Sequence, residues 1–284
     1  MGRQSGFELS RRDLLAGLAI AAAHPPITRA AAKATAFALI GDRYHNSDYI
    51  RIGLGRTLEK EAGIPIDFCD ETSMLSQETL SGYKLLIILR DGMTWPAGYP
   101  DETTNAAYLR TGSPKLVSDP AVPKTEAKPH YWITADQGSA VKRFVAGGGA
   151  ALMMHNVTYV SPHNPDFRDV LGAVTEGHPP IRTFKVKVKN SDHPITRGVK
   201  DFVVTDEQHY VKYEKDAKHL LLESVNEEGL TFKELGASSA AGWAYDYGKG
   251  RVCYLAPGHL LTALWNPEYI KLQQNAARWL LRQI

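Results

Sequence analysis

Apolar residues cluster in short runs along the first third of this chain, separated by amphipathic or polar segments. The runs at residues 35–41, 64–69 and 85–89 have the length of buried strands and are largely apolar at consecutive positions. Between the first two, apolar residues recur every three or four positions over residues 50–62, which predicts a helix ending at Gly63. Strands that alternate with helices are typical of βαβ units, so the pattern predicts an α/β fold with a doubly wound, mainly parallel sheet.

The same alternation returns in the second half of the chain. A helical pattern over residues 136–146 leads through three glycines into an apolar strand at residues 150–154. Residues 182–189 alternate apolar residues with lysines, which predicts a strand with one solvated face, antiparallel or at the sheet edge. Further elements are predicted as a strand at residues 220–225, a hairpin at 243–256 and a helix from Pro267 onward.

Residues 92–135 interrupt this pattern. The segment contains six prolines and little periodicity, and a loop of that length is either disordered or a functional covering segment. Its aromatic residues, Trp95 among them, favour order, because disordered segments are poor in aromatics. We therefore predict an ordered lid.

The first 32 residues differ in character from the rest. They contain the pair Arg11–Arg12, a short apolar run at residues 14–23 and three alanines at 30–32, the parts of a Tat-type export signal. The alternative is an amphipathic or membrane-anchoring helix, but the apolar run is shorter than the roughly 20 residues that span a bilayer. We predict a signal peptide at residues 1–32, read by the Tat export machinery, and one domain at residues 33–284 of a periplasmic or secreted bacterial protein.

Net charge excludes some classes of partner. Four of the 33 basic and two of the 31 acidic residues lie in the predicted signal, so the remaining chain would carry 29 of each and no net charge. A neutral chain has no general electrostatic attraction to nucleic acid or anionic lipid, and no later apolar segment is long enough to span a membrane. The two cysteines, Cys69 and Cys253, could pair in an oxidising compartment, but both lie in apolar runs, which favours two buried thiols.

Polar residues stand directly after four of the predicted strands. In a parallel sheet these positions meet at one edge, where ligands of such folds bind. Histidine titrates near neutral pH, so histidines and acids gathered there could transfer protons, although a histidine after a strand can also simply bind loop carbonyls. The candidates are Asp42, His45, Arg90, Asp91, His155, Asn156 and His259. A second polar cluster, Asp206–Glu207–Gln208–His209, either faces the same site or forms an exposed turn.

Several short motifs occur in an order that resembles the ThuA-like (trehalose-utilisation) domain, and together they extend from about Thr35 to the C-terminus. They are GGGAALMMH at 147–155, HPITRG at 193–198, TDE at 205–207, WAYDYGKGRV at 243–252, Gly258–His259 and NAARW at 275–279. The resemblance implies the class I glutamine amidotransferase-like fold, a flavodoxin-like three-layer α/β domain. That fold agrees with the pattern of strands and helices.

Amidotransferases of this fold place a nucleophilic cysteine in a tight turn after a strand, and His155 aligns with that position. Cys69 and Cys253 both lie elsewhere, so we expect no glutaminase activity. The resemblance assigns the family's later histidine to His259.

The resemblance also links the chain to disaccharide catabolism, including routes through 3-keto sugars. We expect an exported lyase, hydrolase or isomerase acting on a disaccharide or 3-keto-glycoside, with His155 and His259 as the acid–base pair, Asp42 or Glu207 orienting them and His45 beside them. Substrate contacts are expected from Arg90, Asp91, Asn156, Asp206, His209, Trp95 and Trp265. Two alternatives stay open: a sugar-binding module without catalysis, and a metal-dependent hydrolase, since three histidines and an acid can hold a divalent metal such as zinc.

Overall fold

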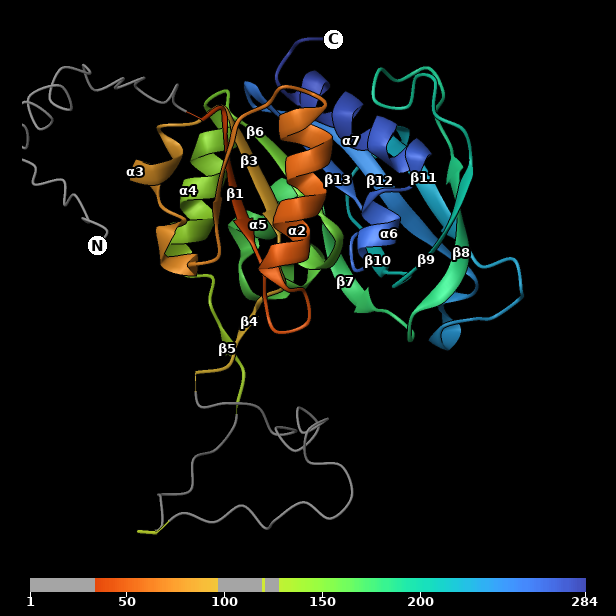
Figure 1. Cartoon of the computed structure of the whole chain (residues 1–284), viewed down its shortest axis with the longest axis horizontal. Coiled ribbons are helices and arrows are strands. Elements are labelled where there is room, and N and C mark those ends of the chain that lie inside the picture. The colour runs from red at the N-terminus through yellow and green to blue at the C-terminus, as the bar shows by residue number, and fades with distance from the viewer. Residues whose placement is uncertain (1–33, 97–118, 121–127) are drawn as a thin grey trace, which may run out of the picture. The chain divides into compact units, whose positions relative to one another are not determined.

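The computed structural model describes residues 34–96, 119–120 and 128–284, and its central element is a nine-stranded sheet (Figure 1). The strands lie side by side in the order β2-β1-β3-β6-β13-β12-β11-β8-β9. In that order their bounds are Ile66–Cys69, Ala36–Ile40, Leu85–Leu89, Ala150–Met154, Gly250–Leu255, Ser238–Tyr247, Leu220–Val225, Arg182–Val188 and Phe202–Asp206.

The five strands from β2 to β13 run parallel to one another. The three central ones read AFALI, LLIIL and AALMM, and all of their residues are buried because helices cover both faces of the sheet. The prediction of buried parallel strands is confirmed. Their carboxyl ends share one edge, which brings the loops that follow them together.

The other half of the sheet is antiparallel, from β13 through β12, β11 and β8 to β9. Since only β12 and β8 reverse direction, seven of the nine strands described still point the same way, and the prediction of a mainly parallel α/β sheet holds. The strand predicted at residues 182–189 is antiparallel as expected, but it lies beside the edge rather than at it. The edge strand is β9, whose sequence FVVTD alternates buried and exposed residues.

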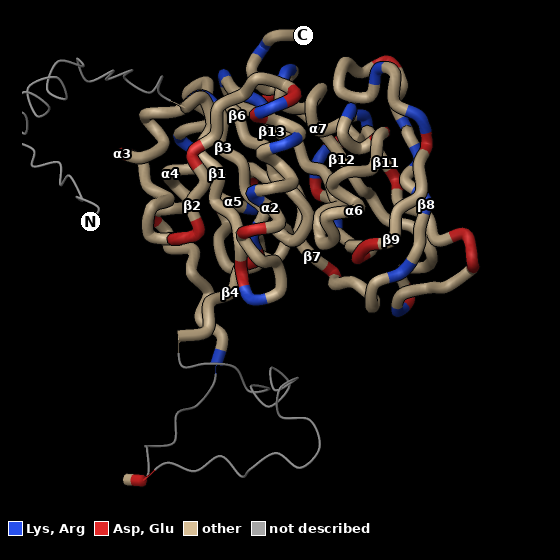
Figure 2. Tube along the Cα trace, in the orientation of Figure 1, with Lys and Arg blue, Asp and Glu red and all other residues tan. Residues whose placement is uncertain are grey.

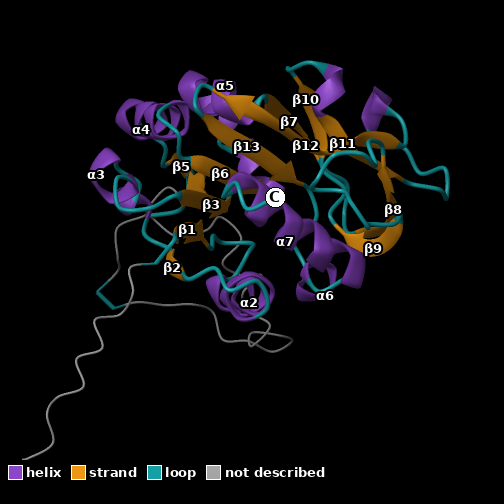
Figure 3. Ribbon diagram, turned by 90° about the horizontal axis from the view of Figure 1, so that it is seen from above, coloured by secondary structure: helices purple, strands orange, loops and turns teal. Residues whose placement is uncertain are grey.

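Helices cover the sheet on both faces and complete a three-layer arrangement (Figure 3). On one face lie α4 (Ala135–Ala146) and α5 (Pro165–Leu171), and on the other lie α2 (Ser47–Leu54), α6 (Leu261–Leu264) and α7 (Pro267–Leu280). A short helix, α3 (Gln77–Leu80), precedes β3.

Side-chain caps explain where the longer helices begin. Asn46 caps α2, Thr134 and Gln137 form a reciprocal capping box on α4, and Asn266 caps α7 ahead of Pro267. The helix predicted over residues 50–62 is helical but not uniformly α, because α2 continues as a π-helix over Gly55–Lys60.

Two small ribbons flank the main sheet. Strand β7 (Ala173–Gly177) pairs with β10 (Tyr210–Tyr213), and β4 (Met93–Thr94) pairs with β5 (His130–Tyr131) at the base of the segment predicted to be a lid. Most of that segment lies outside the described residues. Just after β5, the buried Trp132 donates its indole N–H to the carbonyl oxygen of Asp91, which ties the segment to the loop after β3.

The predicted export signal also lies outside the described residues. Basic and acidic residues are interspersed along the described chain (Figure 2). Within it, no helix has the length and apolar character needed to cross a bilayer. Both cysteines are unpaired; Cys253 is buried as predicted, but Cys69 is only partly buried, because it lies at the end of the edge strand β2.

Candidate functional site

The loop after β1 orients the first histidine of the site. Asp42 accepts hydrogen bonds through Oδ1 from the backbone N–H groups of Tyr44 and His45, at 2.8 and 3.0 Å. The same oxygen lies 2.8 Å from Nδ1 of His45. A carboxylate can only accept here, so Nδ1 carries the proton and the lone pair of a neutral His45 ring lies on Nε2.

The loops after β3 and β6 lock this carboxylate in place. Oδ2 of Asp42 accepts from the backbone N–H of Asp91 at 3.0 Å and from Nδ2 of Asn156 at 2.8 Å. Three neighbouring strands therefore hold one buried carboxylate, which in turn fixes the His45 ring.

His155 occupies a strained turn directly after β6. Its backbone has φ of +51°, a left-handed conformation that residues other than glycine seldom adopt. Its ring is completely buried, and Nδ1 donates to the carbonyl oxygen of Ala256 at 2.8 Å, so the Nε2 lone pair faces the site. Gly258 packs against this ring: a Cβ there would lie 2.7 Å from Cβ of His155.

The end of β9 reaches the same place although β9 is the edge strand. Asp206, its last residue, is fully buried and accepts from the backbone N–H groups of Gly258 and His259, at 2.8 and 3.1 Å. The alternative of an exposed turn is therefore wrong for Asp206. The interaction brings Glu207 up against the histidines that follow β1, β6 and β13.

Three imidazole nitrogens and one carboxylate converge at this point. Nε2 of His45 lies 3.1 Å from Nε2 of His155 and 2.9 Å from Nδ1 of His259. Glu207 lies 3.3 Å from His155 Nε2 through Oε2 and 3.2 Å from His259 Nδ1 through Oε1. Donor atoms about 2.0–2.1 Å from a tetrahedral zinc ion would be separated by roughly 3.3 Å, so this spacing fits a metal centre.

The positions of the imidazole protons also favour a metal centre. Because Nδ1 of both His45 and His155 is used as a donor, their Nε2 atoms are acceptors in the neutral rings, and two acceptors 3.1 Å apart need a proton or a cation between them. A ligating histidine characteristically donates its other ring N–H to a carboxylate or a carbonyl, as both rings do here. The four residues can hold a divalent cation.

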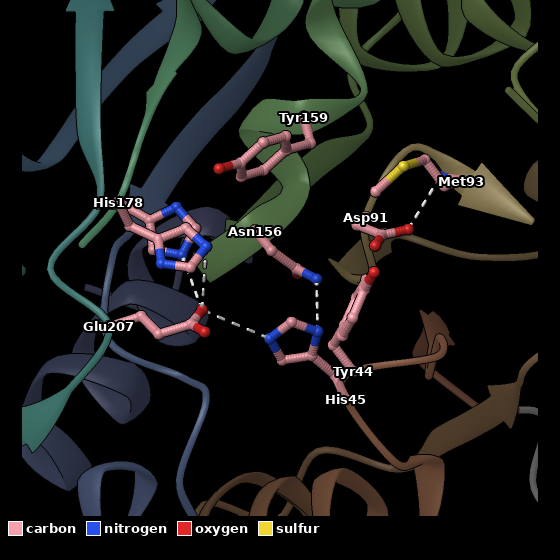
Figure 4. A pocket seen from close by; sticks show the side chains of 9 residues that line it. Tyr44, His45, Asp91, Met93, Asn156, Tyr159, His178 and Glu207 are labelled. Carbon is pink, nitrogen blue, oxygen red and sulfur yellow. Dashed lines mark hydrogen bonds and ion pairs between the residues drawn. The ribbon is translucent and has the colours of Figure 1, made fainter. Parts of the chain in front are cut away.

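Two further histidines approach Glu207 from the other side. His178 follows β7 and His209 follows β9; their Nε2 atoms lie 3.8 and 3.4 Å from Oε2 of Glu207. Figure 4 shows Glu207 between His178 and His45, with Asn156 and Tyr159 nearby. The carboxylate therefore has imidazoles on both sides.

Burial and neighbouring charges set the protonation of these groups. Burial alone would raise the pKa of Glu207, but contacts with His155, His209, His259 and His45 outweigh it and hold that pKa well below its usual range. Burial lowers the pKa of His155. Burial also raises the pKa of Asp91 to about 7, with a further contribution from the charge of Asp42.

A cavity of about 410 Å³ opens beside this cluster (Figure 4). Its volume lies within the range of small-molecule sites. It is lined by Tyr44, His45, Asp91, Met93, Asn156, Tyr159, His178, Glu207 and His209.

Some predicted residues meet at the cavity and others do not. His45, Asp91, Asn156, Glu207 and His209 line it; Asp42, His155, Asp206 and His259 stand behind or beside that lining. Arg90 instead donates to loop carbonyl oxygens, including Asp70 O at 2.8 Å. Trp95 lies against Arg43 in a separate hollow, and Trp265 packs under Arg56.

Sequence reasoning missed Tyr44, Met93, Tyr159 and His178. The clearest available indication was at His178, which follows Gly177 and precedes two prolines. Glycine permits the φ of +105° at position 177, and the residue before a proline is restricted to extended conformations. Together these two constraints fix the turn that presents His178.

Comparison with known proteins gives a consistent family and fold. The family model ThuA, described as trehalose utilisation, matches residues 23–280. A ThuA-like protein from Bacteroides uniformis is 18% identical, with a TM-score of 0.58 over 90% of this chain and 95% of that one. A ThuA-like protein from Parabacteroides merdae is 14% identical, with a TM-score of 0.62 over 88% and 90%.

The fold also occurs within a longer enzyme. A β-galactosidase from Bacillus circulans sp. alkalophilus is 15% identical, with a TM-score of 0.51; the match covers 87% of this chain and 31% of that one. No protein among the curated sequences matches.

Proposed function

Since this chain belongs to the ThuA (trehalose utilisation) family, and that family suggests a carbohydrate-related function, we propose that the chain is an enzyme that acts on a disaccharide or a 3-keto-glycoside. The reaction would be a lyase, hydrolase or isomerase step driven by acid–base chemistry at the His–Glu centre. The absence of a cysteine at position 155 argues against glutaminase activity.

The observation that carries the proposal is the convergence of His45 Nε2, His155 Nε2 and His259 Nδ1 on the carboxylate of Glu207. We propose that a divalent cation, zinc being the best match to imidazole and carboxylate donors, is held there by His45, His155, His259 and Glu207. When bound, such a cation would supply Lewis-acid polarisation of a substrate carbonyl or hydroxyl oxygen, with that oxygen as a donor added to the four protein ligands.

Asp91 is the best-suited proton acceptor among the residues lining the cavity. It faces the cavity, and its pKa of about 7 lets it take and return a proton near neutral pH. His155 has no exposed surface and its Nδ1 is occupied, so we assign it to orienting and ligating rather than to direct contact with the sugar.

The test is turnover of disaccharides and their 3-keto derivatives by tag-free protein, followed by NMR. We expect product after loading with Zn²⁺ or Mn²⁺, loss of product after EDTA treatment, and at least about a 100-fold loss in His155→Ala and in His259→Ala. His219→Ala, which removes a histidine packed on Tyr245, is the matched control. Unchanged turnover in both site variants contradicts the proposal, and binding without product favours the non-catalytic sugar-binding module.

We also propose that residues 1–32 direct export through the Tat machinery to the periplasm or beyond. The support is the twin arginine followed by a short apolar run. Replacing Arg11 and Arg12 together by lysine should leave the protein in the cytoplasm of a Tat-competent bacterium, as judged by cell fractionation. Normal export of that double variant would contradict the assignment.

A further inference from the structure

We propose that the centre holds a second divalent cation, bound by His178, His209 and Glu207 on the side of the cavity. This inference rests on the proposed function, in which a first cation lies between His45, His155, His259 and Glu207.

The donor atoms around Glu207 outnumber those that one cation uses. Five imidazoles surround one carboxylate, and Oε2 of Glu207 lies within 3.8 Å of a nitrogen of four of them. One zinc ion takes four donors, sometimes five, so a single cation leaves His178 and His209 without a role.

The position of the proton on His178 leaves its Nε2 atom as a possible ligand. Its Nδ1 lies 2.9 Å from the carbonyl oxygen of Pro179, which can only accept, so Nδ1 carries the proton. The lone pair on Nε2 then points towards Oε2 of Glu207, another acceptor, at 3.8 Å. A neutral His178 therefore offers Nε2 as a ligand while its Nδ1–H is held by a carbonyl oxygen, an arrangement characteristic of metal-ligating histidines.

His209 lies buried beside the same carboxylate. Its side chain is completely buried, and neither ring nitrogen makes a hydrogen bond within the described chain. A buried polar group without a hydrogen-bond partner is costly. Coordination through Nε2, which faces Oε2 of Glu207 at 3.4 Å, would give that nitrogen a partner.

The carboxylate is placed to bridge the two cations. Oε1 of Glu207 lies 3.2 Å from His259 of the first group, while Oε2 lies 3.4 Å from His209, 3.8 Å from His178 and 3.3 Å from His155, so the carboxylate contacts ligands of both positions. Carboxylate-bridged pairs of this kind hold their ions about 3.5–4 Å apart. The buried carboxylates of Asp42 and Asp206, which contact the first group of ligands, offset part of the repulsion between two cations.

The two cation positions differ in how accessible they are from the cavity. The first has four protein ligands, among them His155, whose side chain is 0% exposed, whereas His178 is 29% exposed and lines the cavity. Three protein ligands leave an open coordination position, as catalytic zinc sites do. The second position is therefore the more accessible of the two to a sugar oxygen or a water molecule from the cavity.

The test is the number of zinc ions bound per chain. The full chain without a histidine tag is stripped with EDTA, equilibrated with Zn²⁺ by dialysis and analysed by mass spectrometry of the metal. We expect two ions in the wild type and in His219→Ala, and one in His178→Ala and in His209→Gln. His178 is partly exposed, so its variant is expected to fold even if the His209 variant does not.

Anomalous diffraction of zinc-loaded crystals should give two peaks about 3.5–4 Å apart, one of which disappears in His178→Ala. At most one ion in the wild type, or two ions retained in His178→Ala, overturns the inference. The stoichiometry is independent of turnover: two ions without any product would refute the proposed function alone, and product with a single ion would refute this inference alone.

Discussion

The two halves of the sheet contribute to the candidate site in different ways. The parallel half supplies side chains from the loops after β1, β3, β6 and β13, and those loops meet because parallel strands share one carboxyl edge. The antiparallel half, with the β7–β10 ribbon, supplies Glu207, His209 and His178. The antiparallel half is held next to the parallel half by the carboxylate of Asp206, which accepts hydrogen bonds from the backbone N–H groups of Gly258 and His259.

The two halves supply different kinds of ligand to the candidate metal centre. The parallel half provides buried imidazoles already oriented by hydrogen bonds, and the antiparallel half provides the charge and the accessible ligands. If this division is right, removing the Glu207 carboxylate should weaken the binding of both cations. A substitution within one half should weaken only the cation that the ligands of that half bind.

Glu207→Gln should therefore have the largest effect. Glutamine keeps the shape of the side chain but removes the charge that faces histidines of both groups, so we expect zinc affinity to fall by more than about 100-fold and turnover with it. Zinc titration with a chromophoric chelator as competitor measures the affinity. Glu223→Gln, which affects a surface pair with Lys189, should match the wild type. Wild-type zinc affinity in Glu207→Gln would mean that the two halves do not share a ligand.

Asp42→Asn should have the next largest effect, and only on the first cation. The asparagine can no longer stabilise the His45 ring as an anionic acceptor for Nδ1–H, and loss of such an outer partner weakens metal binding by about 10–100-fold. The measurement is the pair of zinc affinities, of which the tighter should weaken and the other should not. Asp48→Asn, on the surface of α2, serves as the control. Equal weakening of both affinities would contradict a division between the halves.

The same division decides how much could be predicted from the sequence. Asp42, His45, Asp91, His155 and His259 were predictable together because buried apolar runs identify the strands, and strand ends in a parallel sheet converge whatever the intervening sequence. β9 points the same way as the parallel strands, but it lies four strands away from β13, and no rule brings the end of so distant a strand to that place. Glu207 and His209 could therefore be identified as a polar cluster, but their location could not. Their position depends on the Asp206 contacts, which only tertiary packing determines.

The remaining differences have similar causes. His178 was missed because it follows β7, a strand of a two-stranded ribbon whose sequence, AVTEG, has no clear alternation. Trp265 was expected to contact substrate because tryptophan stacks on sugars, but its ring lies under the guanidinium of Arg56, 4.8 Å from the ring centre. A residue's chemistry can be read from the sequence, whereas the direction of its side chain at a helix end cannot.

Gly258→Ala tests the packing between the loops after β6 and β13, and we expect a smaller effect on stability. The new methyl group would lie 2.7 Å from Cβ of His155, and the strained turn at His155 leaves little room to shift, so the free energy of unfolding should fall by about 1–3 kcal/mol. Urea denaturation measures it. Gly55→Ala, in a helix where the nearest atom is 3.4 Å away at the flexible end of Glu59, should be neutral or slightly stabilising. Equal effects of the two substitutions would mean that His155 is not packed as described.

The last expected effect concerns pH and belongs to the parallel half alone. Asp91 binds its proton with a pKa of about 7 in the folded chain and near 4 in the unfolded chain, because burial and the charge of Asp42 oppose its ionisation. Between these values the folded state binds more protons, so this group makes the free energy of unfolding fall as pH rises from about 4 to about 7. Asp91→Asn should remove that slope from EDTA-treated protein, measured by urea denaturation at pH 5 and pH 7, whereas the exposed Asp192→Asn should keep it. An unchanged slope in Asp91→Asn would show that Asp91 is already ionised at pH 5; it would then be too weak a base for the role assigned to it, and the proton acceptor would have to come from the other half of the site.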